Sequence, residues 1–171
     1  PFEQVPQLFR NESGTRFREI SNSAGPFFQT RRVGRGSAMA DFNRDGLADL
    51  AVSHLNQKVV LLQNQTRTTG QSIALKLIGT EANRSAIGAV VEITAGKRKL
   101  MRLRKGSSSY LSADESEILV GLGEQRDAVT VKVIWPGGKS EIWTGFKAGQ
   151  HYTLIEGNSD SQKSIPSQSE E

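Results

Sequence analysis

The chain has no cysteine, no long apolar run and no sustained helical periodicity. The absence of Cys excludes disulfides, a thiolate nucleophile and a cysteine zinc site. No run approaches the roughly 18 apolar residues that a membrane-spanning helix needs. No signal peptide is visible, and because the sequence opens on Pro1 we expect it to be a piece of a longer precursor.

Recognisable catalytic machinery is also missing. The only histidines are His54 and His151, and we expect both to be side chains at strand edges. The triple serine 107–109 lacks a G-x-S-x-G elbow, and a serine hydrolase needs a base and an oxyanion hole around its nucleophile. The sequence therefore predicts a protein that is not an enzyme.

What the sequence does contain is a series of short apolar segments separated by turns. There are 17 glycines, and 36% of the 171 residues are hydrophobic, enough for a core. Across 72–156, alternating stretches such as Val129–Ile134 recur about every ten residues, with Gly or Pro turns between them. This pattern predicts an all-β fold, with an antiparallel sandwich or barrel in the second half. Trp135 precedes a Pro-Gly-Gly turn, and we expect its side chain to be packed.

The segment Asp41–Asp49 has the most specific spacing in the chain. Oxygen-bearing side chains occur at Asp41, Asn43, Asp45 and Asp49, and Gly46 permits the positive φ of a sharp turn. Ca²⁺ prefers six to eight oxygen ligands, and the backbone carbonyl of Leu47 would supply another. We therefore predict a calcium site formed by these four side chains and the Leu47 carbonyl.

Two other interpretations of this loop are weighed against that prediction. An EF-hand would carry a bidentate Glu at the twelfth position, but Val52 stands there and the flanks are short and apolar. A turn without a metal also favours Asp, Asn and Gly, although four ligands in register with the glycine exceed what a turn requires. The loop is therefore expected to join two strands.

The stretch Ala40–Val52 resembles the calcium loop of FG-GAP/VCBS repeats, the blades of integrin-type β-propellers. Two similar tetrapeptides, Leu8–Asn11 and Leu61–Asn64, stand about 53 positions apart, and blade periods are near fifty. The resemblance implies about one and a half blades in residues 1–64. Because a blade buries its faces against neighbours, we expect the rest of a propeller in the full-length chain.

The second half carries another resemblance. Its motifs are Asn83–Ala89, Gly106–Ser112, Gly121–Gly123 and Val133–Lys139. They are similar to the motifs of the ASPIC/UnbV domain, which commonly follows FG-GAP/VCBS repeats. The resemblance implies a non-catalytic module located outside the cytoplasm. We expect residues 65–71 to be a linker, 72–156 to be the ASPIC/UnbV β-domain, and 157–171 to be a disordered tail.

These observations predict a secreted or periplasmic calcium-binding interaction or adhesion module, a C-terminal fragment of a larger propeller protein. Its partner is an unknown protein or glycan. The net charge of +4 does not indicate a nucleic-acid partner. One alternative is a glycan-active enzyme fragment that uses Asp114, Glu115 and Glu117 as acids. Another is polyanion binding through the basic run 97–105, although a solvated outer strand face also explains that run.

The connector 24–36 allows either a structural or a binding role. Phe27 and Phe28 are expected to plug a core edge rather than to form a binding patch. Arg31, Arg32 and Arg35 could hold an anion, but we expect them to be solvated.

Overall fold

The computed structural model describes residues 2–67, 70–158 and 162–163, and its regular structure is almost entirely β. Two short 3₁₀ helices, η1 (Ser21–Ser23) and η2 (Pro26–Gln29), interrupt the strands. The strands are β1 (Phe9–Glu12), β2 (Arg16–Glu19), β3 (Gly34–Ala40), β4 (Asp49–His54), β5 (Gln57–Leu62), β6 (Gln71–Ile78), β7 (Val90–Ala95), β8 (Arg98–Leu103), β9 (Ile118–Gly123), β10 (Val129–Ile134), β11 (Ser140–Phe146), β12 (Gln150–Ile155) and β13 (Gln162–Lys163). The all-β prediction is confirmed.

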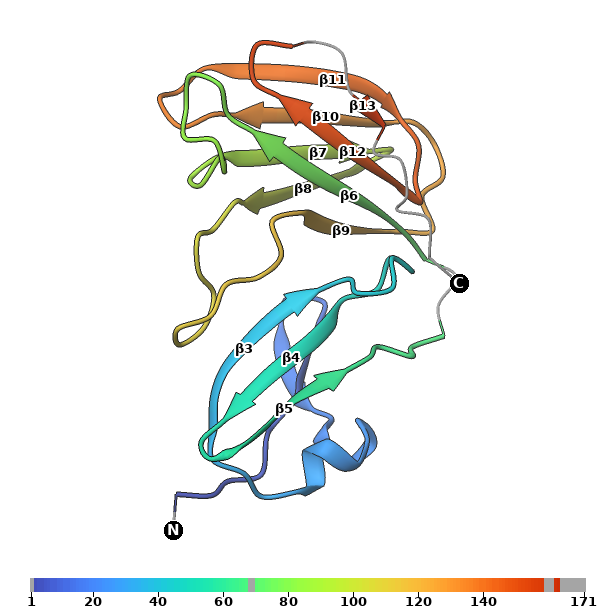
Figure 1. Ribbon diagram of the computed structural model, residues 1–171. Helices are drawn as coiled ribbons and strands as arrows, with labels where there is room; N and C mark the ends of the chain where they lie inside the picture. The colour runs from blue at the N-terminus through green and yellow to red at the C-terminus, as the bar shows by residue number, and fades with distance from the viewer. Residues whose placement is uncertain (1, 68–69, 159–161, 164–171) are drawn as a thin grey trace, which may run out of the picture.

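The second half of the chain forms two four-stranded sheets. Their strand orders are β11-β10-β7-β8 and β13-β12-β6-β9, and Figure 1 shows them at the top of the view. The first sheet is antiparallel throughout, but β12 pairs with β6 in parallel, from Gln150 opposite Ile73 to Ile155 opposite Ile78. The second sheet is therefore mixed, because β12 returns to the sheet in the same direction as β6.

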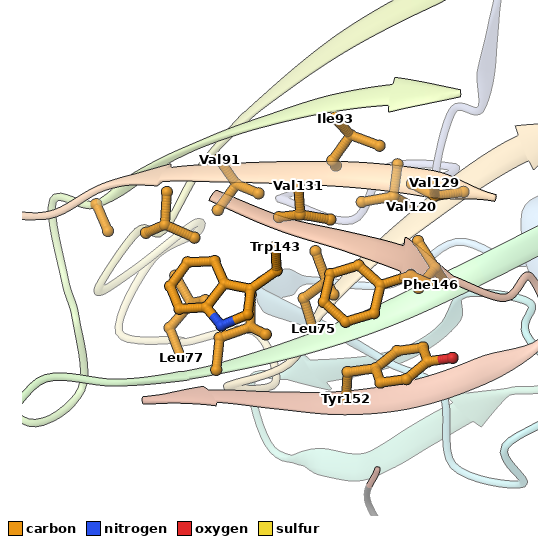
Figure 2. Close-up of a cluster of buried hydrophobic side chains, with 14 of the residues drawn as sticks. Leu75, Leu77, Val91, Ile93, Val120, Val129, Val131, Trp143, Phe146 and Tyr152 are labelled. Carbon is orange, nitrogen blue, oxygen red and sulfur yellow. The ribbon is translucent and has the colours of Figure 1, made fainter. Parts of the chain in front are cut away.

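The hydrophobic core lies between these two sheets. Alternation along β10 buries Val129, Val131 and Val133 completely, and Leu75 on β6 and Leu154 on β12 are equally buried. Figure 2 shows side chains from both sheets meeting in this cluster. Burying one such side chain contributes roughly 1.5–3 kcal/mol, so the period-two pattern of the sequence is what stabilises the sandwich.

Trp135 is packed, as its position before a tight turn predicted. Its side chain is buried, its ring meets Trp143 edge-on at 6.5 Å between centroids, and its Nε1 donates to Glu141 Oε2 over 2.7 Å. Gly137 and Gly138 have φ values of 104° and 95°, which a side chain would make costly. The turn therefore holds the indole over the core while its polar atom keeps a partner.

The first half forms two smaller sheets. A hairpin of β1 and β2 pairs Phe9 with Glu19, and β3-β4-β5 form an antiparallel three-stranded sheet. No apolar residue before Ile73 belongs to the fully buried core of the described residues. Within the described part of the chain, no helix has the length and apolar character needed to cross a membrane.

The predicted linker and tail meet the described structure only in part. Gln71, assigned to the linker, begins β6, and residues 68–69 lie outside the described residues. Most of the predicted tail also lies outside them, and within it Gln162–Lys163 forms β13 against Tyr152 and Thr153.

Glu156 fixes the loop that follows β6. Its Oε2 accepts hydrogen bonds from the backbone N–H groups of Thr80, Glu81 and Ala82 at 2.9, 3.0 and 2.8 Å. These bonds, led by the one from Ala82, hold the pKa of the carboxyl below its usual range, against the opposing effect of burial. The charged form of Glu156 therefore favours the folded state.

The Glu156→Gln variant should have a lower Tm than the wild type at pH 7, because a neutral amide oxygen accepts the three bonds less strongly. A carboxyl whose pKa is lowered by folding adds stability above its unfolded-state pKa, and this is lost as pH falls through the folded-state pKa. The difference in Tm should therefore shrink below about pH 4.3. Thermal melts between pH 3 and 7, with exposed Glu124→Gln as control, measure it. A difference independent of pH would contradict this role.

Candidate metal loop and the junction around it

Loop 41–49 connects β3 to β4 as a hairpin, as the sequence predicted. Ala40 on β3 pairs with Asp49 on β4, so the two ends of the loop lie side by side. Inside the loop, Arg44 and Gly46 adopt positive φ values of 56° and 84°. This conformation turns the chain back sharply and brings the backbone N–H groups of the turn toward the side chains at its base.

Asp41 and Asp49 form the buried base of the loop, with exposed fractions of 7% and 1%. Asp41 Oδ1 accepts from the N–H of Asp45 at 3.1 Å, and its Oδ2 accepts from that of Gly46 at 2.8 Å. Asp49 Oδ2 accepts from the N–H of Phe42 at 3.1 Å. Both carboxylates are thus oriented by amides of the loop itself.

Asn64 completes the support of Asp49. Its N–H donates to Asp49 Oδ1 at 2.7 Å, and its Nδ2 donates to the carbonyl of Ala48 at 3.1 Å. Sequence reasoning did not assign Asn64 to the site, although it ends the tetrapeptide that the chain repeats. The repeated asparagine was the signal that could have identified it.

Asn43 and Asp45 lie on the exposed side of the same loop. Asn43 Nδ2 donates to Asp45 Oδ2 at 2.8 Å, while Asp45 Oδ1 accepts from the N–H of Leu47 at 2.8 Å. The loop therefore brings all five predicted positions, including Leu47, into one short turn.

The carboxylates of the loop have no cationic partner among the described residues. Among the described residues, none of the ion pairs includes Asp41, Asp45 or Asp49. In the same part of the chain, no three Asp, Glu, His or Cys side chains gather in a group that could hold a metal ion. The carboxylates instead accept amide N–H bonds, and each oxygen retains a further lone pair.

The acids proposed for catalysis have structural contacts. Asp114 Oδ1 accepts from the N–H of Met39 at 2.8 Å and from Ser108 Oγ at 2.7 Å. Glu115 accepts through Oε2 from the N–H of Asp41 at 3.0 Å, and its own N–H donates to the carbonyl of Met39 at 2.8 Å. The two carboxylates cover the free edge of β3.

Glu117 and the two histidines also differ from expectation. Glu117 Oε2 lies 2.7 Å from His151 Nδ1, and both side chains are mostly buried. His54 is 9% exposed and packs its ring 5.9 Å from that of Phe27, so it is not an open strand-edge side chain. The neighbouring ring of Phe27 contributes to its burial.

The segment 107–115 extends from the sandwich to β3, as the connection between β8 and β9 in Figure 1 shows. Ser37 N–H donates to Ser109 Oγ at 3.3 Å, so Ser37 and Met39 of β3 both have partners in this segment. Gly46 lies against the start of β6, where a Cβ would come 2.4 Å from Ser72 Oγ. The candidate metal loop is consequently held by the sandwich on two sides.

The basic run 97–105 lies on and beside β8, at the edge of its sheet. Arg98 Nη1 donates to the carbonyl of Leu122 at 2.9 Å, and Arg102 Nη1 donates to that of Met101 at 2.9 Å. Met101 and Leu103 are exposed between these cations. Charged residues on a strand edge discourage pairing with other chains, which explains the run without a ligand.

Gly36 offers a direct test of the contact between β3 and segment 107–115. A Cβ at this position would come 2.1 Å from Ser112 Oγ and 2.4 Å from the carbonyl oxygen of Tyr110. Gly36→Ala should therefore displace the segment and speed hydrogen exchange at the amides of Met39, Asp41 and Glu115 by at least about tenfold.

Gly34→Ala, two residues away on the same strand, is the matched control because nothing lies within 4 Å of its Cβ position. Amide exchange followed by NMR measures both variants. Unchanged exchange in Gly36→Ala, or equal acceleration in both, would show that the segment does not depend on this close approach.

Comparison with known proteins finds a family that is similar to part of the chain. Residues 79–161 match the family model described as ASPIC and UnbV, whereas no curated protein matches the chain. The match spans β7 to β12 of the sandwich. The FG-GAP/VCBS resemblance of residues 1–64 lies outside it and stays a prediction. Residues 79–161 are thus the part of the chain that is similar to a known family, ASPIC and UnbV.

Proposed function

We propose that loop 41–49 binds Ca²⁺ and that the chain is a non-catalytic, extracytoplasmic interaction or adhesion module. One observation carries the proposal. Asp41 and Asp49 are both buried at the base of the loop, and no cationic side chain among the described residues pairs with them. Burying two negative charges without a countercharge is unfavourable, and a bound cation would offset that cost.

The donor chemistry of the loop fits a hard cation. Asp41, Asn43, Asp45 and Asp49 supply only oxygens, and the Leu47 carbonyl is a fifth ligand of the same kind. Asp41 and Asp49 are already fixed by amides, while Asn43 and Asp45 are exposed and bonded to each other. Binding requires these two exposed side chains to exchange that bond for the ion. Calcium tolerates such irregular geometry better than Mg²⁺ does.

Support for an interaction module comes from the surface of the first half. Phe9, Phe17, Val59 and Leu61 are 51%, 71%, 60% and 66% exposed. Apolar exposure of this kind is typical of a surface that packs against other protein. We assign this exposed apolar surface to contacts with further propeller blades. An unknown protein or glycan is then the ligand of the assembled molecule. The structural contacts of Asp114, Glu115 and Glu117 support the non-catalytic part.

Calcium should raise the Tm of the chain. Extracellular calcium modules bind with Kd values of about 10⁻⁴–10⁻³ M, and a tenfold excess over Kd stabilises by roughly 1.4 kcal/mol. For a chain of this length that corresponds to about 3–6 °C. Calorimetric melts with 10 mM CaCl₂ or MgCl₂ measure the effect, which should be smaller with Mg²⁺.

Asp49→Asn should abolish the calcium-dependent rise in Tm, because it removes a buried ligand charge while keeping the shape of the side chain. Asp127→Asn, an exposed aspartate of the sandwich, is the control and should keep the full response. A wild-type Tm that ignores calcium, or an unchanged response in Asp49→Asn, would contradict the assignment.

A further inference from the structure

A cavity of about 890 Å³ lies in the first half of the chain, away from the metal loop. Its walls come from the N-terminal segment 2–8, from η2 and from β4. The N-terminal wall is held by an isolated bridge, in which Gln4 and Arg32 exchange two backbone hydrogen bonds of 3.0 Å. A volume of this size is typical of a site for a small organic ligand.

Every ionisable side chain that lines the cavity is basic. These residues are Arg32, Arg35 and His54, and no Asp or Glu is among the described residues of the lining. The remaining lining is largely apolar and aromatic, with Phe27 and Phe28 from η2 on one side. The cavity therefore combines positive charge with an apolar interior.

Two buried polar atoms at this cavity have no hydrogen-bond partner. They are Arg32 Nε and His54 Nε2, and they are the only such side-chain atoms among the described residues. Buried polar atoms are nearly always paired, because an unpaired one costs about 1–3 kcal/mol. Both unpaired atoms belong to residues that line this one cavity.

The neighbours of Arg32 and His54 determine which hydrogen bonds each side chain can donate. Arg32 is held by Gln57 Oε1 at 3.2 Å from Nη1 and by the Phe27 ring, 5.7 Å from Cζ to its centroid. His54 Nδ1 lies 3.3 Å from the carbonyl of Lys58, which can only accept, so Nδ1 carries a proton. Nε2 then becomes a second donor when the imidazole is protonated, beside the donor Nε of Arg32.

We propose that this cavity binds a small organic anion whose carboxylate accepts from Arg32 Nε and from protonated His54. Its apolar or aromatic body fills the space beside Phe27 and Phe28. The arrangement reverses the expectation that the connector arginines are all solvated: Arg32 lines the site, while Arg31 lies outside it. The proposal is independent of calcium binding.

Phenylacetate is the probe, with phenylacetamide as the neutral control of the same shape and acetate as the charged control without a ring. In ¹H–¹⁵N NMR titrations at pH 6, phenylacetate should give saturable shifts at residues lining the cavity. Both controls should bind at least about tenfold more weakly, since charge-assisted bonds and ring burial each contribute more than this factor. Equal binding of phenylacetamide, or no saturable shifts with phenylacetate, would overturn the proposal.

Arg32→Gln should weaken phenylacetate binding at least about tenfold, whereas Arg126→Gln makes the same change of charge on the exposed surface of the sandwich and should leave it unchanged. Because Arg32 also contacts Gln57 and Phe27, thermal melts establish that the variant is folded. If Arg32→Gln unfolds, the comparison of the three probes on the wild-type chain still tests the proposed site. Equal affinities of both variants would contradict the site.

Discussion

Two carboxylates buried at the base of one hairpin constrain the contact between the two halves of this molecule. Backbone amides of the turn and of Asn64 donate hydrogen bonds to the oxygens of Asp41 and Asp49. The positive φ of Gly46 makes that turn possible. The hydrogen-bond partners of these carboxylates are neutral amides and not cationic side chains. This lack of a countercharge is the physical basis for proposing an ion in the loop.

The contact between the two halves of the chain depends on that hairpin. Asp114 and Glu115 bind the edge of β3, and Glu115 accepts from the amide of Asp41 itself. A sheet edge with free N–H and C=O groups invites pairing with another chain, and here the second half of the same chain covers it. Asp41 therefore belongs both to the candidate metal loop and to the contact between the two halves.

Sequence periodicity predicted the sandwich well because burial enforces alternation, as along Val129–Ile134, and because Gly and Pro mark its turns. The hairpin nature of loop 41–49 followed from the short, apolar segments on either side of it. The parallel pairing of β12 with β6 could not be predicted, since alternation is the same in both directions. The contacts of Asp114, Glu115 and His54 were also missed, because they depend on residues distant in sequence that only the fold brings near.

A crystal structure of the chain grown with calcium tests the central claim most directly. The account predicts an ion with oxygen ligands from Asp41, Asn43, Asp45, Asp49 and the Leu47 carbonyl at about 2.3–2.6 Å. It also predicts that the bond between Asn43 Nδ2 and Asp45 Oδ2, 2.8 Å in the present structure, is broken. A loop that keeps this bond at saturating calcium, with no ion beside Asp41 and Asp49, would contradict it.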